Sequence, residues 1–169
     1  MKKSGIVFLA VLVFWAPAMA WAKVIDRTVA FVNNEAILLS ELDARYQKAK
    51  QITPDITRQQ VLNTMINRAL LVQAAKKIFP ETTDEDKLIR DYIDLKVRAF
   101  IKISGQEVRD FYDGNRKNFG SASFDQVKDR IESLLEEQEV NRRLESHIQA
   151  LRSKAWVEVF LEGPPPLFH

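Results

Sequence analysis

The stretch TRQQVLNTMINRALLVQAAKKI, residues 57–78, decides the fold. It opens on Thr57 and has Gln60 three residues later, a capping box that satisfies the first free N–H groups of a helix. Because the apolar positions cover too wide an arc for a helix with one face in water, they predict a central helix covered on more than one side. Those positions are Val61, Leu62, Met65, Ile66, Ala69, Leu70, Leu71, Val72, Ala75 and Ile78. Phe79-Pro80 is expected to end this helix.

The segment before the central helix predicts a β-hairpin that runs into a first helix. Residues 24–32 are rich in β-branched and aromatic side chains, which suits a strand. Asn33-Asn34 can form a two-residue turn because Asn tolerates positive φ, and residues 36–39 would return as the second strand. Ser40, with Asp43 three residues later, predicts the start of a helix that runs to about Gln51.

Two more helix starts follow the central helix. Residues 83–86, Thr-Asp-Glu-Asp, predict a third helix. Its apolar positions at helical spacing are Leu88, Tyr92, Leu95, Ala99 and Ile103. Ser104 and Glu107 form another capping box and predict a short helix, which Gly114 and residues 118–120 would break.

The last third of the chain predicts a long helix and a closing strand. Ser123 opens a helix that runs to about Lys154, on the order of 45 Å long. Its apolar stripe weakens between Glu136 and Arg143, and residues 156–161 then read as a strand. Because an isolated hairpin is marginal in water, we expect this strand to join the N-terminal hairpin. The predicted fold class is therefore mainly α with a small antiparallel β-sheet, in which the N-terminal hairpin and C-terminal strand are joined by a helical core.

The first 22 residues have the layout of a secretory signal peptide. Lys2 and Lys3 precede a short apolar run, and small residues follow Pro17. Cleavage after Ala20 and cleavage after Ala22 both fit the pattern. The apolar run is shorter than the ~20 residues of a spanning helix, so we expect export through a cleaved signal and no stable membrane insertion after cleavage.

Loss of this segment changes the charge of the chain. Lys2 and Lys3 are its only charged residues, so the 25 Lys and Arg residues fall to 23, equal to the 23 Asp and Glu residues. A formally neutral chain gives no support to a nucleic-acid-binding role. We expect residues 23–161 to form a single core whose N- and C-terminal parts join near residues 113–122, followed by a flexible tail over residues 162–169.

The ingredients of catalytic and metal sites are scarce. The chain has no Cys and two His residues, His147 and His169, which excludes thiol chemistry and Cys-based metal sites. Its few glycines form no phosphate-binding cluster. The acidic residues at 81–86 lack the ligand spacing of a calcium loop and suit the first turn of a helix. We therefore expect no catalytic, cofactor-binding or metal-binding residue.

Several segments, in order, resemble the SurA-type periplasmic chaperones. Val24–Ile37, running into Leu39–Asp43, is similar to the hairpin and first helix at the start of that family's mature chains. Val61–Leu71 resembles its next helix, and Ile103–Tyr112 resembles the element that ends its N-terminal module. Ser123–Ile131 and Leu151–Val157 are similar to its C-terminal helix and closing strand.

The chain also departs from that family. Family members usually carry one or two parvulin-type prolyl isomerase domains, of about ninety residues each, between the short helix and the long terminal helix. Only residues 113–122 lie in that gap here, so the resemblance implies the chaperone core without the isomerase. The helical hairpin that commonly precedes the third helix in that family is also shortened here, to residues 79–82.

The resemblance implies an ATP-independent holdase, not an enzyme, that binds unfolded outer-membrane proteins in the periplasm. Two alternatives remain open. One is an exported structural or interaction module, which could form a homodimer by exchanging its long helix or terminal strand. The other is a degenerate prolyl isomerase. Aromatic side chains near helix ends and on one helix face are the candidate client-binding residues, with ordinary packing as the competing explanation. They are Tyr92, Phe111, Tyr112 and Phe119.

Overall fold

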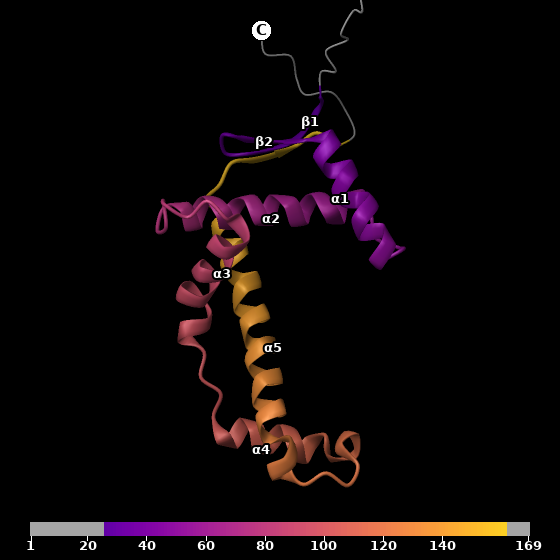
Figure 1. Cartoon of the computed structure of the whole chain (residues 1–169), viewed down its shortest axis with the longest axis vertical. Helices are drawn as coiled ribbons and strands as arrows, with labels where there is room; N and C mark the ends of the chain where they lie inside the picture. The colour runs from indigo at the N-terminus through magenta and orange to yellow at the C-terminus, as the bar shows by residue number, and fades with distance from the viewer. Residues whose placement is uncertain (1–25, 162–169) are drawn as a thin grey trace, which may run out of the picture.

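The computed structural model describes residues 26–161, and they form a mainly helical fold with one small sheet (Figure 1). The predicted signal peptide over residues 1–22 and the predicted flexible tail over residues 162–169 lie outside the described residues. The elements are β1 (Thr28–Val32), β2 (Glu35–Leu38), α1 (Leu39–Ile52), α2 (Arg58–Lys76), α3 (Glu85–Lys96), the 3-10 turn η1 (Arg98–Phe100), α4 (Gly105–Gly114), the 3-10 turn η2 (Arg116–Phe119), α5 (Phe124–Arg152) and β3 (Val157–Val159). The predicted fold class is confirmed.

The sheet joins the two ends of the described chain, as predicted. Its strand order is β2-β1-β3, and both pairings are antiparallel. Ala30 lies opposite Val159, and Val32 lies opposite Val157. The strands are shorter than expected: β1 begins at Thr28, β3 ends at Val159, and Val24 and Ile25 lie outside the described residues. The third strand supplies the partner that the hairpin needs in water.

Asn33 holds the hairpin turn against both β3 and α2. Its φ of 55° is positive, which Asn tolerates better than most residues. Its backbone N–H donates to the Trp156 carbonyl at 2.7 Å, and its side-chain oxygen accepts from the Trp156 N–H at 3.0 Å. Its side-chain amide also donates to Gln73 of α2 at 2.6 Å. One residue therefore ties the turn to the closing strand and the central helix.

Substitution of Asn33 separates the contribution of its positive φ from that of its side-chain hydrogen bonds. We expect Asn33→Gly to keep the turn and lose the side-chain hydrogen bonds, at a cost of about 1–2 kcal/mol in the free energy of unfolding. Asn33→Ala also strains the positive φ, so it should cost about 1 kcal/mol more than the Gly variant. Urea denaturation of both variants measures the difference. Equal stability of the Gly variant and the wild type would show that the side-chain bonds contribute nothing.

The helix starts follow the predicted caps except at α1. The Thr57–Gln60 and Ser104–Glu107 capping boxes are both formed. The prediction of Ser40 as N-cap was wrong, because α1 begins at Leu39. Asp26 takes the capping role from fourteen residues upstream, since its carboxylate accepts hydrogen bonds from the Ser40 hydroxyl and N–H. These bonds lower the pKa of Asp26 below its ordinary value, led by the hydroxyl bond.

The third helix is shorter than predicted. The spacing of Leu95, Ala99 and Ile103 predicted a helix that runs past residue 100, but α3 ends at Lys96. Val97 turns into the interior and is buried, whereas Leu95 is exposed, so the buried face does not continue along the helix. The chain then passes through η1 into an extended connection to α4.

The central helix α2 contributes to both buried clusters of the larger of two lobes. One buried cluster packs α2 and α1 against the sheet, with Leu62 and Ile66 fully buried in it. A second cluster packs α2 against Leu88 and Tyr92 of α3. Leu151 of α5 packs against both clusters. We call this part of the molecule, with β1–β3, α1–α3 and the end of α5, the sheet lobe; the prediction that α2 is covered on several sides is confirmed.

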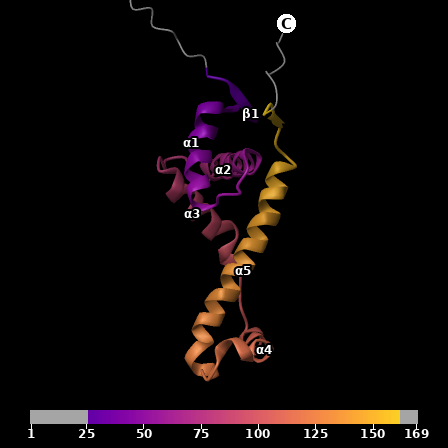
Figure 2. The same cartoon turned by 90° about the vertical axis from the view of Figure 1, so that its right-hand side faces the viewer.

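The smaller lobe lies at the far end of α5, away from the sheet in both views (Figures 1 and 2). Its buried residues are Val108 and Tyr112 of α4 and Ile131 of α5, with Phe111, Phe119 and Phe124 packed around them. We call α4, η2 and the first turns of α5 the distal lobe. Its cluster contains no residue of the two sheet-lobe clusters, so α5 is the element that spans both lobes.

The connection between the lobes lies along the middle of α5. Arg98 of η1 donates to Glu136 at 2.8 Å and to Glu137 at 3.1 Å, and these bonds raise its pKa above the ordinary value. Arg143 of α5 donates to the Phe100 carbonyl at 3.0 Å. Val140 is buried here, although the apolar stripe of α5 weakens in this region. Polar side chains thus join η1 to α5.

Candidate functional site

An apolar groove lies between α1 and α2, on the surface of the sheet lobe. Its volume is about 340 Å³, and its apolar lining consists of Ala49, Ile52, Ile56, Val61 and Met65. That volume is at the lower end of the ~300–1,000 Å³ of typical ligand pockets, enough for roughly one or two apolar side chains. The groove is therefore a surface where a chain segment could bury apolar side chains.

Ile52 is the most exposed large apolar side chain of the described residues, at 86%. It continues the spacing of Leu42, Tyr46 and Ala49 along α1. Leu42 is fully buried, and Tyr46 and Ala49 are partly buried against the core. Ile52 alone lies beyond the part of α1 that the core covers. The helical spacing of α1 contained the signal for this residue, but the sequence prediction did not single it out.

The charged side chains that line the groove are all cationic. Arg45 and Lys48 come from α1, and Arg68 comes from α2. Arg68 pairs with Glu85 at 3.4 Å and with Asp86 at 2.8 Å. No ion pair involves Arg45 or Lys48 within residues 26–161. The sequence prediction missed this arrangement because the net charge of the chain does not show how α1 and α2 bring three cations together.

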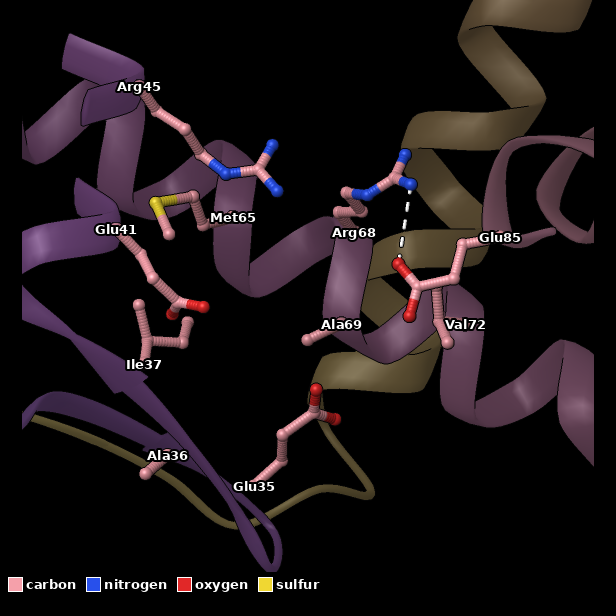
Figure 3. A pocket seen from close by; sticks show the side chains of 10 residues that line it. All are labelled: Glu35, Ala36, Ile37, Glu41, Arg45, Met65, Arg68, Ala69, Val72 and Glu85. Atoms are coloured by element: carbon pink, nitrogen blue, oxygen red, sulfur yellow. Dashed lines mark hydrogen bonds and ion pairs between the residues drawn. The ribbon is translucent and has the colours of Figure 1, made fainter. Parts of the chain in front are cut away.

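A second, smaller pocket of about 170 Å³ adjoins the cationic end of the groove (Figure 3). The two hollows share Arg45, Met65 and Arg68. Figure 3 shows the Arg45 side chain extending from α1 toward α2, above Ile37 of the sheet, whereas the Arg68 side chain points away from Arg45 and toward Glu85. Unlike the groove, this pocket is also lined by carboxylates, so the two hollows differ in charge.

Another hollow, of about 460 Å³, lies where α5 passes the start of α4. Its apolar lining is limited to Ile103 and Leu135. Glu139 here accepts from Arg142 and Arg143, each at 2.6 Å, and these bonds lower the pKa of Glu139 to about 2. This hollow is mainly an ion-pair network and offers less apolar surface to a ligand.

The four predicted site residues lie in two separate places. Tyr112, Phe111 and Phe119 come together in the distal lobe, with ring centroids 5.4 Å apart for Tyr112 and Phe119 and 6.5 Å apart for Phe111 and Phe119. Tyr112 is only 5% exposed, and its hydroxyl donates to the Ala122 carbonyl. Phe111 and Phe119 are half-buried in the same cluster. These side chains stabilise the turn from α4 to α5.

Tyr92 lies in the sheet lobe, far along the chain from the other three. It is 4% exposed, and its hydroxyl is 2.9 Å from Nε2 of His147 on α5. Burial raises the pKa of Tyr92. Burial, together with Lys96 and Lys154, lowers the pKa of His147 below its ordinary value of 6.5. The pair packs α3 against α5, and with Tyr92 and Tyr112 buried we leave both tyrosines out of the candidate surface.

The lowered pKa of His147 gives a pH-dependent stability. The folded chain binds the imidazole proton less well than the unfolded chain, so stability is complete above ~6.5 and falls as the pH drops through the lowered folded-state pKa. His147→Gln should remove this part of the pH dependence. Urea denaturation of both proteins between about pH 5 and pH 7.5 measures it. If the free energy of unfolding changed equally with pH in both proteins, His147 would not be the cause of the pH dependence.

The lowered pKa values of two further carboxylates have structural causes. The carboxylates of Asp84 and Glu107 cap helices, and backbone hydrogen bonds lower the pKa of each. Within residues 26–161, no group of three or more His, Cys, Asp or Glu side chains is placed to hold a metal ion. None of the helices over the same residues is long and apolar enough to cross a membrane.

Comparison with known proteins shows a similarity over part of the chain. The chain matches no model of a known protein family. It is 38% identical over 82 residues to the chaperone SurA of Alcanivorax borkumensis, a match that covers 43% of this chain and 19% of SurA. The match thus spans about a fifth of the length of that relative. It supports a SurA-like relationship for part of the chain.

Proposed function

We propose that this chain is a SurA-like chaperone that holds unfolded polypeptides in the groove between α1 and α2. The observation that carries the proposal is the open apolar lining of that groove, with Ile52 exposed at its edge. An apolar side chain of a bound segment would gain roughly 25 cal/mol for each Å² of surface removed from water. Because this gain does not depend on one side chain's shape, the groove suits clients of varied sequence.

The holding mechanism needs no nucleotide. An extended segment would place one or two apolar side chains in the groove, and further segments would contact other exposed apolar residues on the same molecule. Phe100, Leu95 and Leu134 are such residues, and Phe100 is 66% exposed. Several weak contacts along one chain give avidity, while each contact stays easily broken. Such binding would keep a client unfolded and still let it leave.

The partial similarity to SurA supports a chaperone-like role and a periplasmic location. On that basis we propose unfolded outer-membrane proteins in transit as the clients. The predicted signal peptide over residues 1–22 agrees with this location. We propose no cofactor.

We further propose that the chain has no prolyl isomerase activity. The α4 and α5 helices are connected by residues 115–123, which include η2 and a turn at Gly120 with a positive φ of 56°. An isomerase domain of about ninety residues does not fit in this connection. A proline-peptide isomerisation assay with a rate above background would contradict this part.

The experiment that tests the function is the aggregation of an unfolded outer-membrane protein on dilution from urea. With the chain in molar excess we expect light scattering to fall well below that of the client alone, without added ATP. An unrelated helical protein of similar size and charge serves as the control. Scattering that equals the control at a stoichiometric excess would refute the holdase proposal.

A further inference from the structure

The groove between α1 and α2 has two different ends. Residues 53–57 connect the two helices, so Ile52, Ile56 and Val61 lie at the joined end. Arg45 lies seven residues before Ile52 on α1, and Arg68 lies seven residues after Val61 on α2. At 1.5 Å per residue, about 10 Å of helix separates the apolar end from the cationic end.

The charge along the groove is of one sign. Arg45, Lys48 and Arg68 line it, and none of its lining residues is acidic. Arg68 is already paired with Glu85 and Asp86, whereas no ion pair within the described residues involves Arg45 or Lys48. Two cations beside an apolar groove therefore face water without a carboxylate partner.

The acidic residues of the adjoining pocket are engaged elsewhere. Glu41 of the adjoining pocket accepts from the Leu38 N–H at the start of α1. Glu35 accepts from Gln73, and Glu85 pairs with Lys76. Glu85 also pairs with Arg68 (Figure 3). These carboxylates are held by their own partners, which leaves Arg45 and Lys48 open to a carboxylate from a ligand.

We propose that the groove prefers extended segments in which an apolar side chain and a carboxylate are four residues apart, so that both lie on the face toward the groove. An extended chain advances ~3.3 Å per residue and its side chains alternate between two faces, so four residues span ~13 Å along one face. The long side chains of Arg45 and Lys48 can cover the difference from the ~10 Å between the two ends of the groove. The apolar side chain would lie against Ile52, Ile56 and Val61, and the carboxylate would pair with Arg45 and Lys48. This preference rests on the proposed function, because it names the segments that the same groove would hold.

The expected size of the preference is moderate. Exposed ion pairs contribute little each and weaken with salt, so two of them should change the dissociation constant by about 3- to 10-fold at low ionic strength. Raising the salt concentration above about 0.5 M should reduce the difference to less than twofold. The apolar contact should persist at high salt.

The test compares three short peptides, each with a neutral fluorescent label, by fluorescence anisotropy. The first has a Leu-Phe pair with Asp four residues after the Phe, the second has Asn in place of that Asp, and the third has Asp directly after the Phe. We expect the first to bind the wild-type chain about 3- to 10-fold more tightly than the second, with the third between them. The variant Arg45→Gln with Lys48→Gln should bind the first two peptides equally.

The matched control is Lys50→Gln with Arg130→Gln, which makes the same change in net charge at exposed sites outside the groove. It should keep the preference for the first peptide. Equal binding of the Asp and Asn peptides to the wild type would overturn the inference while the holdase proposal stands. A preference for the Asp peptide that persists in the variant Arg45→Gln with Lys48→Gln would also overturn the inference. If no peptide bound, both the inference and the holdase proposal would be contradicted.

Discussion

Replacing Leu62 with Ala is expected to lower the free energy of unfolding of the sheet lobe by about 2–5 kcal/mol. Leu62 is 0% exposed, and it lies in the cluster where α2 packs against the sheet and α1. The change removes buried methyl groups and leaves a cavity that close-packed neighbours fill only in part. Since domains of this size are stable by about 5–15 kcal/mol, the loss is a large share of the total.

The matched variant is Ile131→Ala in the distal lobe, where Ile131 is also buried. Its cluster contains no residue of the sheet-lobe clusters, so its loss should fall mainly on α4 and the first turns of α5. Amide hydrogen exchange measures the two effects separately. We expect Leu62→Ala to speed exchange in β1 and α2, and Ile131→Ala to speed exchange in α4. Equal acceleration throughout by both variants would show that the two lobes unfold as one unit.

The second large effect is expected on client holding. Ile52→Gln removes the most exposed apolar contact of the groove without adding a charge. Full burial of one such side chain is worth about 1.5–3 kcal/mol, so we expect the dissociation constant of an apolar peptide to rise about 10-fold or more. Because Ile52 is so exposed, stability should change by less than about 0.5 kcal/mol.

Ile78→Gln is the control for this variant. Ile78 is an exposed Ile on the sheet lobe that does not line the groove. It should leave peptide binding and aggregation suppression at the wild-type level. A loss of binding as large as that of Ile52→Gln would mean that exposed apolar surface in general, not the groove, holds the client.

Much of the fold could be predicted because its signals are local. The boxes at Thr57 and Ser104 pair residues three apart, so they fix helix starts without knowledge of the tertiary structure. The Asn33-Asn34 turn and the β-branched residues around it predict the hairpin in the same way. The marginal stability of a lone hairpin then predicts the third strand.

The errors arose where distant residues decide the local structure. Asp26 reaches Ser40 through the folded hairpin and displaces the predicted N-cap of α1. Burial of Val97 and the ion pairs of Arg98 with α5 accompany the early end of α3, although the spacing beyond it still looks helical. Neither contact can be read from periodicity.

The candidate site was predictable only in part. Aromatic side chains suit client contacts, but Tyr92 and Tyr112 are buried, where their hydroxyls have partners in the protein. Periodicity cannot separate exposed apolar residues from core residues. Ile52 and the cations of the groove become visible only once α1 and α2 are placed side by side.

The most direct test of the proposed client site is site-specific photocrosslinking. A photoreactive phenylalanine analogue at position 52 would be exposed to light in the presence of an unfolded outer-membrane protein. The same analogue at position 130, exposed in the distal lobe, serves as the control. We predict strong crosslinks from position 52 that an excess of apolar peptide removes, and few from position 130. Crosslinks of equal yield from both positions, or none from position 52, would contradict the assignment of the α1–α2 groove as the client site.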